Sequence, residues 1–287
     1  MNIEVGVIGG SGLYAMDGLS VQYERMIDTP FGAPSDPYVL GEVDGLGVAF
    51  LSRHGRGHRY TPSEINYRAN LYGFTVLGVH TILSASAVGS LKEDLHPTDI
   101  AFPHQFIDRT RHRADTFFGN GVVGHVPFAD PVCTAVSSLM GAAARSAGAK
   151  VHEGGTYVCM EGPQFSTRAE SNLYRSWGAD VIGMTNLTEA KLAREAELCY
   201  ATMALVTDYD CWHPDHDDVS IDQILGYLRA NVTMAQTILR TSIRAAVQRQ
   251  RDCPCASALK FAILTDPASI PPRVRDDLAP ILGKSMT

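Results

Sequence analysis

Basic residues are scarce in this chain, and long apolar runs are missing. The 287 residues contain 24 Lys and Arg against 31 Asp and Glu, a formal charge of -7. Nucleic acids and anionic membrane surfaces are bound through broad basic patches, so we expect neither as a partner. No apolar run approaches the roughly 18 residues that cross a bilayer, and no charged-then-apolar leader opens the chain. We therefore expect a cytoplasmic protein in which any bound anion is held by a local basic cluster.

Cysteine is also infrequent, with six residues and no secretory signal to suggest an oxidising compartment. We expect reduced, mostly buried thiols in place of a disulfide framework. Cys253-Pro254-Cys255 does not have the Cys-x-x-Cys spacing of a zinc or redox motif, so it predicts no structural metal. A disulfide from this pair to Cys199 or another thiol stays open. Pro214 prevents the helical spacing that would pair His213 with His216 as ligands, and no metal is expected there either.

Apolar runs rich in β-branched or small residues alternate with helical patterns along the chain. Strands are predicted at residues 4–8, 48–52, 81–88, 180–184 and 198–207, and helices at 132–146, 168–177 and 221–250. Thr167 and Glu170 form a capping-box pattern before the second helix, as do Ser220 and Gln223 before the third. This alternation predicts an α/β fold with a mostly parallel central sheet covered on both faces.

No repeat, low-complexity tract or linker divides the chain. We therefore predict one domain over residues 1–287, with a core at about 3–250 and a C-terminal extension at 251–287. Three prolines within residues 266–272 predict irregular structure there. The extension is expected either to dock on the core or to fray.

Two loops that follow predicted strands are suited to anions. Gly9-Gly10-Ser11-Gly12 exposes backbone N–H groups and a hydroxyl, as phosphate-binding loops do. Gly10-Ser11-Gly12-Leu13-Tyr14-Ala15 also fits a dinucleotide fingerprint for NAD or FAD, and a tight turn without a ligand is a further alternative. Arg53-His54-Gly55-Arg56-Gly57-His58-Arg59 is a dense basic loop in which Arg53 offers a fork for two phosphate oxygens and His54 a further donor. A solvated basic loop is the alternative.

Two further strand ends and one loop carry small, aromatic or polar residues. Residues 84–90 are nearly all small, which leaves room for a ligand or reflects tight packing. Phe165, in the loop 160–166, offers an aromatic face to a flat base or belongs to the core. Thr185 and Asn186 supply hydroxyl and amide groups at a strand end, or they cap the helix that follows.

Asp208 and Asp210 follow the apolar run 198–206, at the sheet edge where ligands bind in open α/β folds. Side chains alternate along an extended chain, so the two carboxylates are predicted to share one face. Neighbouring carboxylates push their pKa values apart, so one of them could hold or accept a proton near neutral pH. Capping of the next loop is the alternative role.

Taken together and in order, six short motifs closely resemble those of the trimeric purine nucleoside phosphorylases, and within them the S-methyl-5'-thioadenosine phosphorylases. They are Gly9-Gly10-Ser11-Gly12, Asp28-Thr29-Pro30-Phe31-Gly32, Arg53-His54-Gly55, Glu161-Gly162-Pro163, Met184-Thr185 and Thr207-Asp208-Tyr209-Asp210-Cys211-Trp212. The resemblance covers residues 3–240. It implies a three-layer α/β/α sandwich, a homotrimer, and cleavage of a nucleoside N-glycosidic bond by inorganic phosphate as co-substrate, without metal or organic cofactor.

The resemblance also implies roles for individual residues. Phosphate would be held by Ser11, Arg53, His54, Ser86, Ala87 and Thr185. The nucleoside would be held by Met184 at the ribose, by Phe165 and Ser166 at the base, and by Asp208 and Asp210 at its N6 and N7 edge, where both are the catalytic candidates. The 5'-substituent would contact His58, Ile221, Ile224 and Leu225, with His125 entering from a neighbouring subunit.

Base and sugar preference follow from the same positions. Asp210, where relatives that use 6-oxopurines usually carry Asn, favours 6-aminopurines, and the apolar 5'-pocket favours a methylthio group over a hydroxyl. The main hypothesis is therefore phosphorolysis of S-methyl-5'-thioadenosine to adenine and 5-methylthioribose 1-phosphate. A broader phosphorylase acting on adenosine, inosine or 5'-methylthioinosine is the nearest alternative. A nucleoside sensor and an NAD-linked oxidoreductase are more distant ones.

Overall fold

The predicted α/β architecture is confirmed by the computed structural model, which describes residues 1–10, 12–13, 16–214 and 221–283. The strands are β1 Ile3–Gly9, β2 Leu19–Arg25, β3 Tyr38–Val43, β4 Leu46–Ser52, β5 Thr81–Ser90, β6 Ile100–Phe102, β7 Gln105–Arg109, β8 Val151–Glu153, β9 Thr156–Met160, β10 Val181–Gly183 and β11 Cys199–Asp208. The helices are α1 Tyr67–Val76, α2 Thr134–Ser146, α3 Arg168–Ser176, α4 Asn186–Glu195, α5 Ile221–Gln248, η2 Pro254–Ser257, η3 Pro267–Ser269, α6 Pro272–Asp277 and α7 Ala279–Leu282.

One mixed sheet runs through the molecule, with β5 at its centre. Strand β5 pairs in parallel with β1 on one side and with β11 on the other, and β1 pairs in parallel with β4. Parallel pairs prevail, as predicted. Strands β2, β3 and β4 form an antiparallel ribbon. The sequence predicted β4 but neither β2 nor β3. Strand β2 is largely exposed, so its sequence lacks the buried apolar run by which the other strands were recognised.

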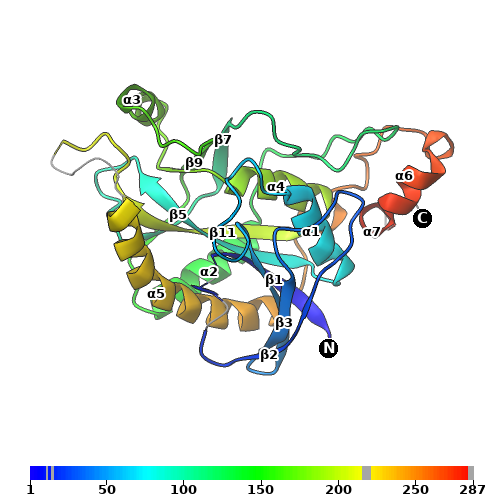
Figure 1. Cartoon of the computed structure of the whole chain (residues 1–287), viewed down its shortest axis with the longest axis horizontal. Coiled ribbons are helices and arrows are strands. Elements are labelled where there is room, and N and C mark those ends of the chain that lie inside the picture. Colours follow the sequence, from blue (N-terminus) through cyan, green and yellow to red (C-terminus); the bar gives the residue numbers. More distant parts are fainter. Residues whose placement is uncertain (11, 14–15, 215–220, 284–287) are drawn as a thin grey trace.

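Helices cover both faces of the sheet and complete the expected three layers (Figure 1). Helices α1 and α4 lie on one face, over a core that includes Leu71, Phe74 and Leu192. Helices α2 and α5 lie on the other, over a core that includes Val136 and Ile238. Helix α3 begins at the predicted capping box, in which Thr167 and Glu170 exchange side-chain and backbone hydrogen bonds.

The parallel strands β1, β4, β5 and β11 deliver their C-terminal loops to one edge of the sheet. The Arg53 backbone N–H, just after β4, donates to the Gly9 carbonyl at the end of β1, over 3.0 Å. Because parallel strands run the same way, the ends of β5 and β11 lie at this edge too. Motifs that are far apart in the sequence therefore meet here.

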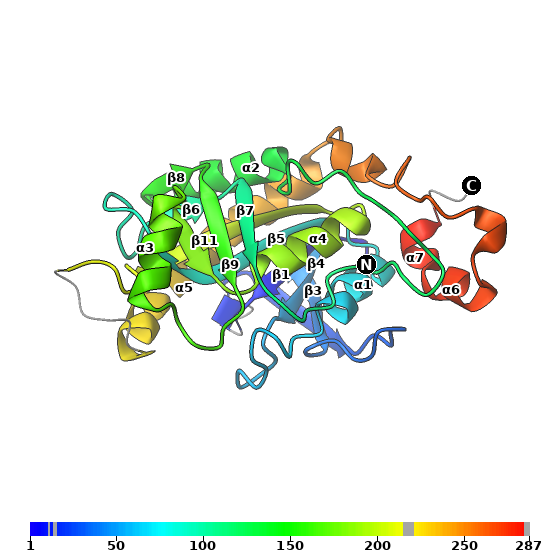
Figure 2. The same cartoon turned by 90° about the horizontal axis from the view of Figure 1, so that it is seen from above.

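The C-terminal extension docks on the core and does not fray in its described part. We had expected its prolines to impose irregular structure, and this prediction was wrong. Helix α6 begins with Pro272 at its first position, where the missing N–H costs nothing. Ile270, Leu278 and Ile281 are buried against the core that includes α1, and the Tyr72 hydroxyl donates to the Asp277 carbonyl. Figure 2 shows α6 and α7 at the end of the molecule opposite α3.

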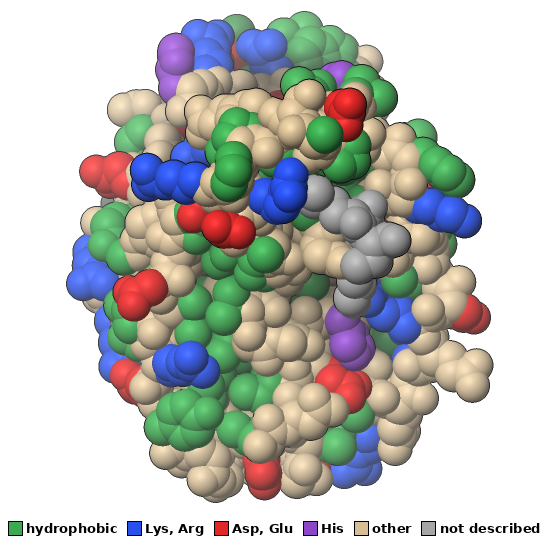
Figure 3. Space-filling model, turned by 90° about the vertical axis from the view of Figure 1, so that its right-hand side faces the viewer, with side chains coloured by type: hydrophobic (Ala, Val, Ile, Leu, Met, Phe, Trp, Pro, Cys, Tyr) green, Lys and Arg blue, Asp and Glu red, His purple; other side chains and the backbone are tan. Residues whose placement is uncertain are grey.

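The surface on the side of the C-terminal helices carries acidic and basic side chains interspersed (Figure 3). The described residues on this face form no continuous basic patch of the kind that nucleic acids require. Within the described residues, the longest apolar stretch of any helix falls short of what a membrane span needs.

Candidate active site

A cavity of about 640 Å³ lies at the C-terminal edge of the sheet, between the loops that the motifs predicted. It is lined by ten of the predicted site residues, namely Arg53, His54, His58, Ser86, Ala87, Phe165, Met184, Thr185, Asp208 and Asp210. They come from the loop after β4, from β5, from the loop after β9, from the segment between β10 and α4, and from the end of β11. The fold thus brings together most of the set that the resemblance implied.

Ser166 and His125 do not line the cavity of their own chain. Ser166 braces the loop next to Phe165, since its carbonyl accepts from the Cys211 thiol over 3.3 Å. His125 is exposed, and its backbone N–H donates to the Ala262 carbonyl. The entry of His125 into a neighbouring subunit stays a prediction.

Several predicted contacts fall outside what the structure describes. Ser11 lies outside the described residues, as do the side chains of Ile221, Ile224 and Leu225. Val232, about two turns beyond Leu225 on α5, lines the cavity. Helix α5 therefore presents at least one apolar side chain to the site.

The two aspartates reach the cavity in a way that the alternation argument did not foresee. Strand β11 ends at Asp208, and Asp210 has a φ of 51°, in the left-handed region that Asp tolerates better than most residues. The Asp208 Oδ1 accepts a hydrogen bond from the Asp210 backbone N–H over 2.8 Å. A turn, and not two strand residues on one face, brings both carboxyls together, so that part of the prediction was wrong.

Burial makes both carboxyls easier to protonate. It raises the pKa of Asp208 to about 6, against opposing hydrogen bonds from Thr207 and the Asp210 backbone, while the charge of Asp210 adds the smallest contribution. Burial also raises the pKa of Asp210, which the nearby Ser171 and Ser166 hydroxyls only partly offset. Loss of water, more than mutual repulsion, thus perturbs the pair. Within the described chain, the buried Asp210 Oδ2 has no hydrogen-bond partner, so it is free to bind a ligand.

Arg53 does not offer its fork to the cavity as predicted. Its buried guanidinium is paired with Glu189, with Nε 2.5 Å from Oε1 and Nη2 3.1 Å from Oε2. Nη2 also donates to the Ser84 hydroxyl and Nη1 to the Ala85 carbonyl. Four of the five N–H donors of an arginine are then used, which leaves one Nη1–H for an anion. Arg53 can supply positive charge and a single hydrogen bond, but not a bidentate clamp.

His54 has a defined tautomer. Its Nδ1 lies 2.8 Å from the Tyr60 carbonyl, which can only accept, so Nδ1 carries the proton. Burial lowers the pKa of His54 to about 4, the charge of Arg53 lowers it further, and only the bond to Tyr60 works strongly against this. The neutral ring therefore presents an acceptor at Nε2, contrary to the predicted donor. The His58 ring stacks on it at 4.2 Å between centroids.

Among the remaining phosphate candidates, Ser86 belongs to a buried polar network. The Ser86 hydroxyl donates to the Asn186 Oδ1 over 2.5 Å, and the Asn186 amide donates to the Ser84 and Tyr200 hydroxyls. Thr185 precedes α4 but makes no side-chain capping bond, so the capping alternative is wrong for this hydroxyl. The amino end of α4 therefore meets the cavity with Thr185 available, and helix amino ends favour anions.

Arg113 and Glu189 were missed from the sequence, although each organises part of the site. The almost fully buried Arg113 donates to the carbonyls of Met184 and Glu161 over 2.6 and 2.8 Å, and its Nε pairs with the Glu161 carboxylate. It thereby links the loop after β9 to Met184. Arg113 lies in an ordinary basic stretch, and Glu189 looked like a routine first-turn acid of a helix, so neither carried a local signal.

Comparison with known proteins agrees with this geometry. The model of the phosphorylase superfamily matches residues 4–244. The chain is 60% identical over 280 residues to the S-methyl-5'-thioadenosine phosphorylase of Geobacter sulfurreducens, covering 97% of this chain and 98% of that protein. It is 58% identical to the protein of the same name from Koribacter versatilis, over 99% of this chain and 97% of that one.

Solved structures give the same result. A methylthioadenosine phosphorylase from an antarctic soil metagenomic library has a TM-score of 0.94 at 48% identity, covering 98% of this chain and 100% of that chain. A mutant adenosine/methylthioadenosine phosphorylase from Schistosoma mansoni, in complex with methylthioadenosine, has a TM-score of 0.82 at 37% identity, over 86% and 93% of the two chains. The chain belongs to the phosphorylase superfamily. Its resemblance to the S-methyl-5'-thioadenosine phosphorylases is confirmed along nearly its whole length.

Proposed function

We propose that this chain cleaves S-methyl-5'-thioadenosine with inorganic phosphate, giving adenine and 5-methylthioribose 1-phosphate. The observation that carries the proposal is a cavity in which two protonatable carboxyls and a group of anion-suited side chains line the same space. The names of relatives at 60% and 58% identity support the same reaction. We propose that phosphate itself is the nucleophile and that the reaction uses no metal or organic cofactor.

The chemistry assigns complementary tasks to the two ends of the cavity. As the bond from C1' to N9 breaks, the sugar becomes cationic and the purine becomes anionic. A phosphate oxygen forms the new bond to C1', and the electron pair of the broken bond passes into the purine. Asp210 gives a proton or a hydrogen bond to N7 of the leaving base, and its raised pKa suits that task. Asp208 holds the turn that positions Asp210 and borders the N6 edge.

Phosphate is held where positive charge, a helix amino end and small residues meet. Arg53 contributes its charge and one N–H, Thr185 a hydroxyl, and Ser86 and Ala87 a close approach to β5. His54, with a free Nε2, accepts an O–H from a protonated phosphate oxygen or takes up a proton when a dianion binds. These groups place the nucleophile without a bidentate arginine.

The nucleoside fits the other side of the cavity. Phe165 is 46% exposed and lines the cavity, so it can cover the flat base. Met184 packs against Gly162, where an added Cβ would lie 2.6 Å from its sulfur, and this contact sets the sulfur for the ribose. Val232 of α5 supplies apolar surface for the 5'-methylthio group.

A homotrimer belongs to the same proposal, with His125 entering the site of a neighbour. Exposed apolar side chains surround the segment that holds His125: Phe261 is 86% exposed, Leu264 65% and Val123 51%. The Leu264 N–H donates to the Val123 carbonyl, so these residues form one surface with His125. Apolar surface of this extent favours burial against another subunit. The cytoplasmic location inferred from the sequence stays a prediction.

The first experiment measures the release of free base from four nucleosides, each with and without inorganic phosphate. The nucleosides are 5'-methylthioadenosine, adenosine, 5'-methylthioinosine and inosine. Fast, phosphate-dependent release from 5'-methylthioadenosine above the others supports the proposal. Preference for adenosine would broaden the sugar specificity, as the name of the Schistosoma mansoni relative suggests for that protein. Preference for a 6-oxopurine would overturn the role of Asp210, and release without phosphate would overturn the reaction.

A further inference from the structure

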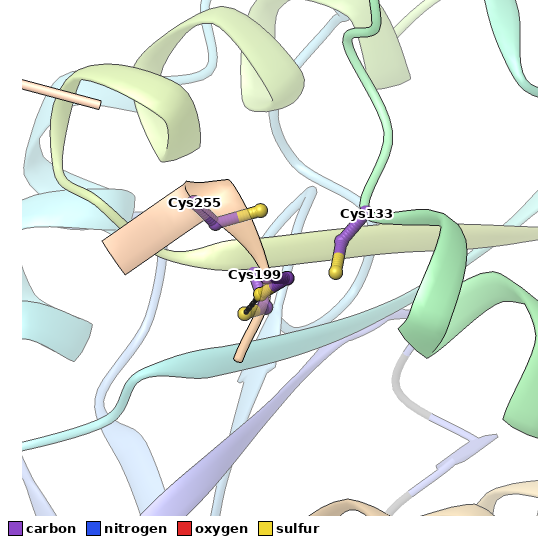
Figure 4. Close-up of side chains that lie close together, drawn as sticks. Cys133, Cys199 and Cys255 are labelled. Carbon is purple, nitrogen blue, oxygen red and sulfur yellow. Dashed lines mark hydrogen bonds between the residues drawn. The ribbon is translucent and has the colours of Figure 1, made fainter. Parts of the chain in front are cut away.

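Four of the six cysteines gather at one point on the side of the sheet that α2 and α5 cover. The sulfur atoms of Cys133, Cys199, Cys253 and Cys255 all lie within 4.8 Å of one another. Cys133 precedes α2, Cys199 is the first residue of β11, and the other two flank Pro254 in the segment after α5. Figure 4 shows Cys133, Cys199 and Cys255 approaching one another from three separate segments. These three are almost fully buried.

We propose that these four cysteines bind one zinc ion as a closed structural site. Zinc prefers four thiolates in a tetrahedron with bonds of about 2.3 Å, which separates every pair of sulfurs by about 3.8 Å. The Cys199 and Cys253 sulfurs lie 3.3 Å apart, and no two of the four sulfurs are more than 4.8 Å apart, so the cluster is close to the size that a zinc site needs. Small shifts of the side chains would complete the tetrahedron.

The mutual closeness of all four sulfurs distinguishes this arrangement from a disulfide pair. A disulfide brings only two sulfurs together, at about 2.05 Å. It gives no reason for the other two to meet at the same point. A central ion does give one, because each ligand must reach the same atom.

Two arginines beside the cluster match the charge of a zinc tetrathiolate. The Arg249 Nη2 lies 3.3 Å from the Cys199 sulfur and 3.7 Å from the Cys253 sulfur. A side-chain hydrogen bond also joins Arg251 to the Cys199 sulfur. Four thiolates around Zn²⁺ leave a net charge of about -2, which two guanidinium groups neutralise. Among the described residues, the exposed Asp252, which pairs with Arg249, is the one carboxylate that pairs with either arginine, so four neutral thiols or two disulfides would leave these partly buried cations with little counter-charge.

The placement indicates a structural role, remote from catalysis. Cys199 begins β11 and Asp208 ends it, so the two sites lie at opposite ends of one ten-residue strand, roughly 30 Å apart. The ion would fasten the start of the C-terminal extension to the sheet. Beyond it the Leu259 N–H donates to Glu197, and the chain continues to the exposed Phe261 beside His125.

This inference departs from the expectation that Cys253-Pro254-Cys255 holds no metal. That expectation weighed the Cys-x-Cys spacing by itself, whereas tertiary structure supplies Cys133 and Cys199 as the other two ligands. A Cys-x-Cys pair can serve when the remaining ligands come from distant segments.

The test is the metal content of the full-length protein, purified under reducing conditions, offered zinc and desalted. We expect about one zinc per chain, released when a mercurial reagent titrates the thiols. Substitution Cys133→Ser or Cys255→Ser should remove most of that zinc. The matched control, Cys159→Ser, alters a buried cysteine outside the cluster and should retain it. Arg249→Gln should weaken zinc retention against a chelator by about 10- to 100-fold.

Wild-type protein keeps the proposal decidable even if the cysteine variants fail to fold. Cobalt added to the reduced, metal-free chain should give the strong absorption of a tetrahedral thiolate site, and zinc should abolish it. Reduced wild-type protein that retains no zinc after desalting would overturn the proposal. So would retention of a full equivalent by both cysteine variants, or four cluster cysteines found as disulfides in protein that binds no metal when reduced. Phosphorolysis measured in parallel tests the proposed function separately.

Discussion

Replacing Asp210 by Asn tests the proposed acid most directly. Asn has nearly the same shape and can still fill the buried position, but it has no acidic proton to share with N7 of the leaving purine. The Asp210 Oδ2 makes no hydrogen bond within the described chain, so the substitution breaks no hydrogen bond of that atom. A well-placed general acid contributes about 10²- to 10⁴-fold. We therefore expect kcat/KM for 5'-methylthioadenosine to fall by that factor, about 2.7 to 5.5 kcal/mol of transition-state stabilisation.

The assay follows adenine release at saturating phosphate across a range of pH. In the native enzyme the protonated acid is the active form, so activity should fall as pH rises through the raised pKa of Asp210. The Asn variant should lose this limb of the profile, and its ratio of inosine to 5'-methylthioadenosine turnover should rise. Asp276→Asn, on the exposed surface of α6, is the matched control and should leave both unchanged. Full turnover of adenine nucleosides by the Asp210 variant would refute the assignment.

Four further predictions follow from particular contacts. Gly89→Ala places a Cβ 2.8 Å from the Asp208 Oδ1, so kcat/KM should fall by about 10²-fold with little change in the melting temperature; unchanged kinetics would contradict the tight approach. Glu189→Gln leaves the buried Arg53 without its counter-charge, so urea unfolding should show a free energy of unfolding lower by about 3–5 kcal/mol. A decrease no larger than the ~1 kcal/mol of an exposed ion pair would contradict the role of Glu189 as the buried partner of Arg53. The folded-state pKa of Asp208, about 6, lies above its ordinary value of 3.8, so the folded state binds more protons than the unfolded state between these pH values. The free energy of unfolding should therefore fall by up to ~3 kcal/mol as pH rises through that window. Asp208→Asn should flatten this slope in urea titrations. Phosphate binding near neutral pH should raise the pKa of His54 from about 4, so that the protein takes up protons. Calorimetry in buffers of different ionisation enthalpy measures this uptake. His54→Gln should abolish it, and an unchanged uptake would assign it to another group.

Local patterns were sufficient for much of the secondary structure. The capping box at Thr167 marked the start of α3, and the apolar runs marked β5 and β11 to within two residues of their ends. These signals are local because helices and buried strands are specified by residues a few positions apart. The exposed strand β2 was missed because it pairs at an edge and buries little.

The loops that line the cavity were also recognisable from the sequence. All but the loop 160–166 follow a predicted strand, and the parallel strands β1, β4, β5 and β11 bring their C-terminal ends to one edge. The roles within those loops were less accessible. Arg53 was expected to clamp phosphate, yet it pairs with Glu189, which lies 136 positions away. The protonated nitrogen of His54 depends on the Tyr60 carbonyl, whose direction no residue pattern encodes.

The sequence by itself determined the α/β class, the order of the functional motifs and the family resemblance, because those rest on residue types at short spacing. Tertiary structure alone decided which polar groups pair, which carboxyls lose water, and that Cys133 and Cys199 meet Cys253 and Cys255. The physical reason is that hydrogen bonds, desolvation and metal coordination depend on distances of a few ångströms between side chains. For residues far apart in the chain, only the packing of the sheet and its helices sets those distances.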